Sequence, residues 1–374
     1  MVERAFVHIG LPKTGTSYLQ TILWASRDQL EADGVVLPGE ERRDHLWASR
    51  VVREDPKVPG LSQRKRTAWD RVVAELAGSD GTGLISHEFF SSATQEQAAR
   101  MVERLAPAEV HVVVTARNAL DLFTASWQES LKNKGTTPMA DYSRRVSQRP
   151  TEIWNWRALD LRLVLERWAP AVPAERVHVL PVDTSAPREA LWRTFCDVVG
   201  LPADHYDTDL SFPNVSMGVA EAETLRRVNQ HLVGFGKSFD RGVWIRTFLA
   251  DERLVPRRGE PYWPLPDQVE ECRERAQQAA DFVVRRGFDV RGDPSLLLVP
   301  DTLPPRRTPD TVTEAEVAEV AVELVATLLG DVRREHGRAR RRAARAPDPA
   351  RRLTSLWRQR GWPTSLKKRR NARS

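Results

Sequence analysis

Cysteine is scarce in this chain of 374 residues, which contains only Cys196 and Cys272. Two cysteines cannot supply the disulfide framework on which small secreted domains depend, so a reducing compartment suits the chain. The sequence lacks a run of about 20 apolar residues, and therefore no transmembrane helix is predicted. Its first apolar segment begins at Ala5, and therefore no secretory signal is expected. We therefore expect a cytoplasmic protein.

Negative charge is nearly absent from residues 333–374. This segment has sixteen basic residues against Glu335 and Asp348, a net charge of +14, while the whole chain carries +6. The rest of the chain is therefore acidic, at −8. We expect a disordered or loosely helical tail. It is either a solvated extension or a surface for an anionic membrane or an acidic partner, and no specific nucleic-acid binding is expected.

Strand and helix patterns alternate through the first two hundred residues. Short apolar runs typical of buried parallel strands occur at Ala5–Ile9, Gly34–Leu37, Gly83–Ser86, Val110–Thr115 and Val177–Pro181. Helical periodicity separates them at Thr16–Glu31, Arg64–Ala77, Gln95–Leu105, Ala119–Asn133, Ala158–Trp168 and Arg188–Val199, and continues at Met217–Leu232, Val243–Ala250, Asp267–Arg285 and Thr313–Arg334. This alternation predicts an α/β fold with a doubly wound parallel sheet flanked by helices, followed by a helical C-terminal portion.

The segment 6–20 joins a strand, a glycine-bearing turn and a helix start. Such a unit directs backbone N–H groups and the positive end of a helix at an anion. A Walker A loop needs Lys directly after its second Gly. Here Gly10 and Gly15 have the correct separation, but Lys13 precedes Gly15 and Thr16 stands at the lysine position. The loop therefore predicts phosphate binding without matching a triphosphatase.

The eight residues from Pro12 to Leu19, Pro-Lys-Thr-Gly-Thr-Ser-Tyr-Leu, resemble the 5′-phosphosulfate loop of sulfotransferases that use 3′-phosphoadenosine 5′-phosphosulfate (PAPS). The chain looks like a soluble bacterial, actinobacterial-type relative, with a P-loop-like sheet. The resemblance implies that Lys13 stabilises the departing phosphate and that Tyr18 stacks on adenine, although Tyr18 also suits simple helix packing. It implies donor contacts from Pro12, Lys13, Thr14, Gly15, Thr16, Ser17 and Tyr18.

A second segment resembles the family's 3′-phosphate motif, in which an Arg ends a strand and a Ser follows about eight residues later on a helix. Arg117 follows the apolar run Val112–Thr115, and ligands of open α/β sheets bind at strand carboxyl ends. The expected serine position is Ala125, and Ser126 lies one residue further. One residue turns a helix by about 100°. The resemblance thus implies Arg117 as a ligand and leaves Ser126 with an uncertain direction.

The resemblance also implies a base at the end of a neighbouring strand, where Ser86, His87 and Glu88 stand. One branch of the family uses His and another uses Glu. Successive strand residues face opposite sides, so one of the two is expected to point inward. We choose His87, whose ordinary pKa near 6.5 suits proton acceptance at neutral pH, and keep Glu88 as the alternative. His45, in the segment Arg42–Trp47, is expected in a loop.

These motifs predict a PAPS-dependent sulfotransferase. Residues 1–332 would form one domain, with an α/β core to about residue 200 and a helical acceptor side after it, while residues 333–374 form the tail. The acceptor is a hydroxyl or amine of a small molecule, lipid or glycan, and the sequence does not identify it. No Cys/His cluster has metal-ligand spacing, so no metal is expected. The alternatives are a P-loop-type kinase or nucleoside triphosphatase, and a non-catalytic nucleotide-binding module with a basic interaction tail.

Overall fold

The computed structural model describes residues 1–209 and 216–345. The chain divides into two units, Met1–Val317 and Ala318–Ser374. The first unit contains the sheet, and the second begins within the last helix. The basic tail predicted from the sequence lies largely outside the described residues.

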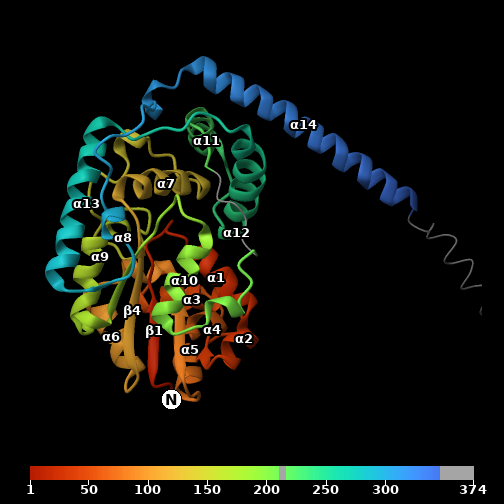
Figure 1. Cartoon of the computed structure of the whole chain (residues 1–374). Helices are drawn as coiled ribbons and strands as arrows, with labels where there is room; N and C mark the ends of the chain where they lie inside the picture. The colour runs from red at the N-terminus through yellow and green to blue at the C-terminus, as the bar shows by residue number, and fades with distance from the viewer. Residues whose placement is uncertain (210–215, 346–374) are drawn as a thin grey trace, which may run out of the picture. The chain divides into compact units, whose positions relative to one another are not determined.

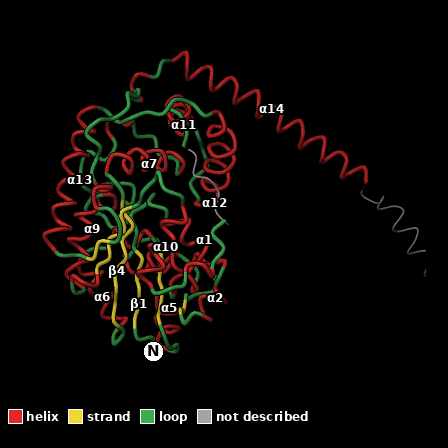
Figure 2. The backbone as a smooth tube through the Cα atoms, in the orientation of Figure 1, coloured by secondary structure: helices red, strands yellow, loops and turns green. Residues whose placement is uncertain are grey.

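Six parallel strands form one sheet in the order β2-β3-β1-β4-β5-β6. Their bounds are β1 Arg4–His8, β2 Val35–Val36, β3 Thr82–Ser86, β4 Glu109–Ala116, β5 Val177–Pro181 and β6 Asp289–Val290. β3, β4 and β5 consist almost wholly of buried residues, as expected of strands covered on both faces. The protein is therefore an α/β protein with an all-parallel sheet flanked by helices (Figures 1 and 2).

Helices connect the strands and cover the sheet. The α-helices of the first unit are α1 Thr16–Ala25, α2 Arg27–Ala32, α3 Arg42–Val52, α4 Gln63–Arg66, α5 Ala68–Ala77, α6 Gln95–Leu105, α7 Ala119–Lys132, α8 Trp156–Leu159, α9 Leu161–Trp168, α10 Arg188–Val199, α11 Val219–His231, α12 Ser238–Asp240 and α13 Pro266–Arg286. A π-helix, η7, spans Arg241–Leu254, and α14 spans Glu314–Arg345. The short 3-10 turns are η1 Val58–Gly60, η2 Glu88–Ser92, η3 Met139–Asp141, η4 Ala169–Ala171, η5 Ala174–Arg176, η6 Ala203–His205, η8 Val255–Arg257, η9 Pro294–Leu297 and η10 Pro309–Thr311.

One face of the sheet carries a large apolar core. Phe6, Leu84, Val113 and Leu180 project from four adjacent strands and pack against α1, α2 and α10. These four residues share a face because each strand alternates its side chains and the parallel register aligns the strands. Figure 1 shows α6, α9 and α13 gathered on the other side of β1 and β4.

The structure corrects several expected boundaries. The helix expected over Thr16–Glu31 breaks at Ser26, and the one expected over Ala158–Trp168 breaks at Asp160, whose side chain caps α9 by accepting from the Leu163 N–H at 3.2 Å. The expected loop at Arg42–Trp47 is instead the start of α3. An edge strand, β6, follows α13 where only helices were expected.

The chain order of the strands creates a switch point between β1 and β4. After β1 the chain moves outward to β2 and returns through β3, and it then crosses β1 to reach β4 and continue to β5. The loops after β1 and β4 therefore diverge at the carboxyl edge of the sheet. Ligands of open α/β sheets bind in the crevice at such a point. Within the described residues, no helix is long and apolar enough to cross a membrane.

Candidate functional site

The loop between β1 and α1 has a conformation that only certain residues allow. Gly10, Lys13 and Gly15 have φ angles of +35°, +69° and +84°. A Cβ on Gly10 would lie 2.5 Å from the Thr16 Cγ2 atom, so glycine is required there. The Leu11 N–H donates to the Thr115 carbonyl at 2.8 Å, which fastens the loop to β4.

A buried chain of hydrogen bonds supports the loop from below. The Thr14 hydroxyl donates to the Leu11 carbonyl at 2.6 Å, so it accepts from the Thr115 hydroxyl at 2.7 Å. Thr115 then accepts from His8 Nε2 at 3.3 Å, and His8 Nδ1 accepts from the Ser86 hydroxyl at 2.8 Å. Burial lowers the pKa of His8 to about 4, which matches this neutral tautomer. Strands β1, β3 and β4 are thereby tied to Thr14.

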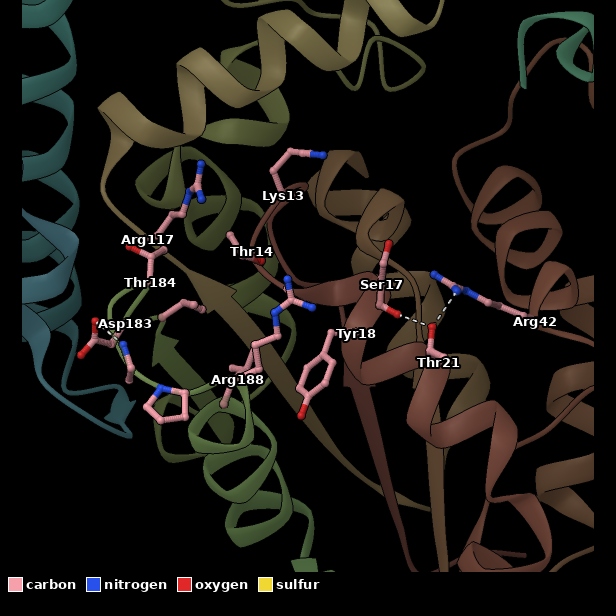
Figure 3. A pocket seen from close by; sticks show the side chains of 15 residues that line it. Lys13, Thr14, Ser17, Tyr18, Thr21, Arg42, Arg117, Asp183, Thr184 and Arg188 are labelled. Atoms are coloured by element: carbon pink, nitrogen blue, oxygen red, sulfur yellow. Dashed lines mark hydrogen bonds between the residues drawn. The ribbon is translucent and has the colours of Figure 1, made fainter. Parts of the chain in front are cut away.

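A cavity of about 490 Å³ opens beside the loop, at the switch point (Figure 3). Its walls come from the β1–α1 loop, the first turns of α1, α3, the end of β4, and the β5–α10 connection. Its lining residues are Lys13, Thr14, Gly15, Ser17, Tyr18, Thr21, Arg42, Arg117, Val182, Asp183, Thr184, Ala186, Pro187, Arg188 and Leu191. Four of them are cationic, and one is acidic. The Asp183 carboxylate accepts from the Ser185 and Ala186 backbone N–H groups at 2.8 and 3.3 Å, so it serves the local turn.

Arg117 lies just beyond β4 and lines the cavity. Its Nη2 atom donates to the Asp121 carbonyl at 2.6 Å, while its Nε atom is buried without a hydrogen-bond partner. Buried donors of this kind are normally paired. Asn118 caps α7 by accepting from the Asp121 N–H at 2.9 Å, which sets the first turn that Arg117 touches. Arg117 is therefore held in place with donor capacity remaining toward a ligand.

Arg188 is a cavity residue that the sequence interpretation did not assign to the site. It begins α10 directly after Pro187, and its guanidinium extends toward the loop near Thr14 (Figure 3). The signal that could have found it is positional, because the first residues after a strand's carboxyl end face the ligand crevice. The β5–α10 connection starts at such a strand end, at Pro181, and Arg188 lies seven residues further along it, whereas Arg117 directly follows Ala116.

The Lys13 ammonium lies against a buried carboxylate. Lys13 Nζ is 3.2 Å from Glu129 Oε2, near the end of α7, and Arg246 of η7 pairs with the other carboxylate oxygen. Burial opposes ionisation of Glu129, but Lys13 and Arg246 hold its pKa at about 2. Figure 3 shows the Lys13 side chain pointing away from Tyr18. Glu129 was also missed in the sequence, since nothing local marks an acidic residue on α7 as the partner of a distant lysine.

A second carboxylate connects to the cavity through two side chains. Arg42 lines the cavity, and its Nε and Nη2 atoms donate to Gln20 Oε1 at 3.1 and 2.8 Å. Gln20 Nε2 in turn donates to Glu88 Oε2 at 3.2 Å. Burial opposes the charged form of Glu88, yet His87, Gln20 and Arg42 keep its pKa below the ordinary value. Glu88 is therefore an oriented carboxylate linked to the cavity wall.

His87 is directed into the protein rather than into the cavity lining. It is 8% exposed, and its Nδ1 atom accepts from the Phe89 N–H at 3.1 Å. The neutral ring then carries its proton on Nε2, and burial lowers the pKa of His87 to about 4. His45 lies on α3, not in a loop, and its Nε2 donates to the Pro38 carbonyl at 2.8 Å. Both rings are engaged by backbone groups.

Ser126 and Tyr18 have different surroundings in the structure. Ser126 is fully buried on α7, where its hydroxyl is 2.6 Å from the Tyr142 hydroxyl, and it is not among the cavity-lining residues. Tyr18 lines the cavity, but its side chain is also largely buried, at 7% exposed, in the apolar core between α1 and α10. Of the residues implied by the loop resemblance, Lys13, Thr14, Gly15, Ser17 and Tyr18 line the cavity, whereas Pro12 in the loop and Thr16 at the start of α1 are not among its lining residues.

Comparison with models of protein families, with curated proteins and with solved structures found no match to this chain. In the described part of the chain, no group of three or more His, Cys, Asp or Glu residues is arranged to hold a metal ion.

Proposed function

We propose that the protein transfers a sulfuryl group from PAPS to a hydroxyl or amine of a small molecule, lipid or glycan. The observation that carries this proposal is the pairing of a non-Walker phosphate loop with two arginines, Arg117 and Arg188, around one cavity at the switch point. Its volume, about 490 Å³, is within the range of nucleotide-sized pockets. A donor with anionic groups at both ends suits such a distribution of charge.

The proposed donor contacts divide between two ends of the cavity. The backbone N–H groups of the loop, the α1 N-terminus and Lys13 would hold the 5′-phosphosulfate. Arg117 and Arg188 would hold the 3′-phosphate, since a guanidinium fork matches phosphate oxygens. The Tyr18 ring edge and Leu191 offer apolar surface to a base.

The proposed chemistry is an in-line displacement at sulfur. The acceptor oxygen or nitrogen forms a bond to sulfur as the bond from sulfur to the bridging phosphate oxygen breaks. The electron pair remains on that oxygen, where Lys13 and the loop amides stabilise the charge. Glu88 receives the acceptor proton in our proposal, because His87 Nδ1 is already engaged by the Phe89 N–H. His87 remains the alternative base from the sequence interpretation.

Thermal unfolding with nucleotides tests the donor assignment. Adenosine 3′,5′-bisphosphate should raise the melting temperature of the full chain, and ATP with magnesium at the same concentration should raise it much less, since stabilisation grows with the logarithm of ligand concentration over its dissociation constant. Adenosine 5′-monophosphate, which lacks the 3′-phosphate, is the matched control. The reverse ranking would favour the kinase or triphosphatase alternative. Donor binding without transfer to any metabolite or glycan pool would favour the non-catalytic module.

A further inference from the structure

A stripe of exposed apolar side chains follows one face of α14, the long helix coloured blue in Figure 1. Val322, Val325, Leu329 and Val332 are 68%, 55%, 66% and 52% exposed. Their spacing of three, four and three residues is the repeat of a coiled-coil seam. Large apolar residues arranged as a continuous exposed stripe mark an interaction surface.

Charge on α14 is separated along the helix axis. The N-terminal part of α14 is acidic, with Glu314, Glu316, Glu319 and Glu323, and the part after the stripe is mainly basic, with Arg333, Arg334, Arg338, Arg340 and Arg341. Two such helices aligned in parallel would place like charges side by side. An antiparallel pair would place each acidic half against a basic half, which is favourable for the same reason that opposite charges are favourable across any interface.

We propose that two copies of this chain associate through antiparallel pairing of their α14 helices along this stripe. The stripe is symmetric about residue 327, so Val325 of one copy faces Leu329 of the second copy. Val322 then faces Val332 of the second copy. These contacts make four apolar layers over about 15 Å of helix, at the ordinary rise of 1.5 Å per residue. A two-fold axis through the centre makes the contact self-complementary and closed.

The residues beside the seam fit the same register. In heptad terms Glu319, Ala326 and Arg333 occupy equivalent flanking positions, and all three are exposed. Antiparallel pairing brings Glu319 of each copy next to Arg333 of the other, while Ala326 of each copy meets its counterpart at the centre. The small central side chains allow close approach, and the two ion pairs at the ends select this orientation.

The same stripe is poorly arranged for an anionic membrane. An interfacial helix carries basic residues beside its apolar face, but here Glu319 and Glu323 neighbour the first half of the stripe. The strongly basic portion begins only at Arg333, where the stripe ends. A second copy of α14 supplies both an apolar face and charges opposite to those of each half of the helix. An anionic lipid surface supplies an apolar layer but no positive charge for the acidic half.

The first experiment measures the mass of the full chain in solution by light scattering and sedimentation, titrated from about 1 to about 100 μM. One chain has a mass of 42.4 kDa, and we expect a concentration-dependent shift to twice that value. Leu329→Asp should abolish the shift. Thr327→Asp introduces the same charge on the opposite face of the helix, about 180° from the stripe, and should retain it. A monomer at every concentration would overturn the proposal, and stripe-dependent flotation of that monomer with phosphatidylserine vesicles would identify a membrane face instead.

A charge exchange tests the proposed register. Glu319→Lys and Arg333→Glu should each raise the dissociation constant at least about fivefold at low salt, because two attractive pairs become repulsive. The double variant Glu319→Lys/Arg333→Glu should restore it. Failure of the double variant to restore association, with helicity by circular dichroism unchanged, would exclude this pairing.

Single cysteines test the orientation. The native Cys196 and Cys272 are buried, so background crosslinking should be low. Ala326→Cys should form a disulfide between copies on mild oxidation, because its counterpart lies beside it. Ala339→Cys should not, since antiparallel pairing about residue 327 separates the two copies of residue 339 by about 36 Å along the helix axis, more than twice the length of the seam. Efficient crosslinking at residue 339 would show parallel pairing and overturn the proposal.

Discussion

Substitution of single side chains in or near the cavity should change either nucleotide affinity or the free energy of unfolding, depending on which residue is removed. The three informative substitutions are Arg117→Ala, Arg188→Ala and Ser126→Ala. Both arginines line the cavity, whereas the Ser126 hydroxyl is 2.6 Å from the Tyr142 hydroxyl and buried. A family-based assignment places Arg117 and Ser126 on the 3′-phosphate. In our proposal Arg117 and Arg188, which both line the cavity, hold it instead.

The magnitudes follow from the kind of contact that is lost. A hydrogen bond to a charged partner contributes about 1.5–3 kcal/mol, and each 1.4 kcal/mol changes a binding constant tenfold. Arg117→Ala and Arg188→Ala should therefore each weaken adenosine 3′,5′-bisphosphate binding by about 10- to 150-fold. Ser126→Ala leaves the buried Tyr142 hydroxyl without its partner, which should lower the free energy of unfolding by about 1–3 kcal/mol and leave nucleotide affinity unchanged.

Isothermal titration calorimetry and urea unfolding, performed on the same preparations, provide the two readouts. Arg193→Ala is the matched control, because Arg193 is exposed on the same helix as Arg188 and pairs with Asp204 at 2.7 Å. It should change neither quantity by much. If Ser126→Ala weakened nucleotide binding as strongly as Arg188→Ala while remaining stable, the reasoning from the Tyr142 contact would be refuted.

Three further outcomes follow from the site. Glu88→Gln should lower sulfuryl transfer at least about 100-fold and His87→Gln less than about tenfold, measured as label moved from PAPS to an acceptor pool; the opposite order would make His87 the base. Glu129→Gln should lower the free energy of unfolding by about 1–3 kcal/mol in urea, since its two cationic partners are partly solvated, and Glu152→Gln, at an exposed pair, should change it little. Burial lowers the pKa values of His8, His45 and His87 to about 4, so the unfolded chain takes up protons before the folded chain as pH falls. The free energy of unfolding should therefore be full above pH 7 and fall between about pH 6.5 and 4, by up to about 1.4 kcal/mol per pH unit for each histidine. A urea midpoint that stays constant across that range would contradict the burial argument.

Much of the sheet could be predicted because its strands are continuous apolar runs. Val110–Thr115 and Val177–Pro181 are the clearest cases, and both are buried strands of the observed sheet. The helix α3 could not be predicted in the same way. It begins with charged residues, and its first turn is stabilised by Asp44, which pairs with Arg64 and Arg71 at 3.2 and 2.9 Å. Arg64 and Arg71 lie about twenty or more residues from Asp44 in the sequence, so no local pattern predicts these ion pairs.

The candidate site was predictable where backbone geometry determines it and unpredictable where side chains from distant helices complete it. The loop around Lys13 has its own signature of glycines and hydroxyl residues, and Arg117 follows a strand end. Arg188 required knowing that β5 lies next to β4. Spacing alone did not give the direction of Ser126, whose hydroxyl is 2.6 Å from the Tyr142 hydroxyl and which is not among the cavity-lining residues; its part in donor binding stays a prediction.

The position of Lys13 in the loop differs from that of a triphosphatase lysine. In a triphosphatase loop the lysine follows the second glycine and lies along the phosphates. Lys13 instead lies three residues earlier, in a left-handed conformation with φ +69°, and its ammonium pairs with Glu129. Glu129 and Arg246 belong to helices α7 and η7, and neither residue lines the cavity. In the sulfuryl transfer that we propose, Lys13 would supply positive charge to the bridging oxygen from the side of the loop that faces α7 and η7.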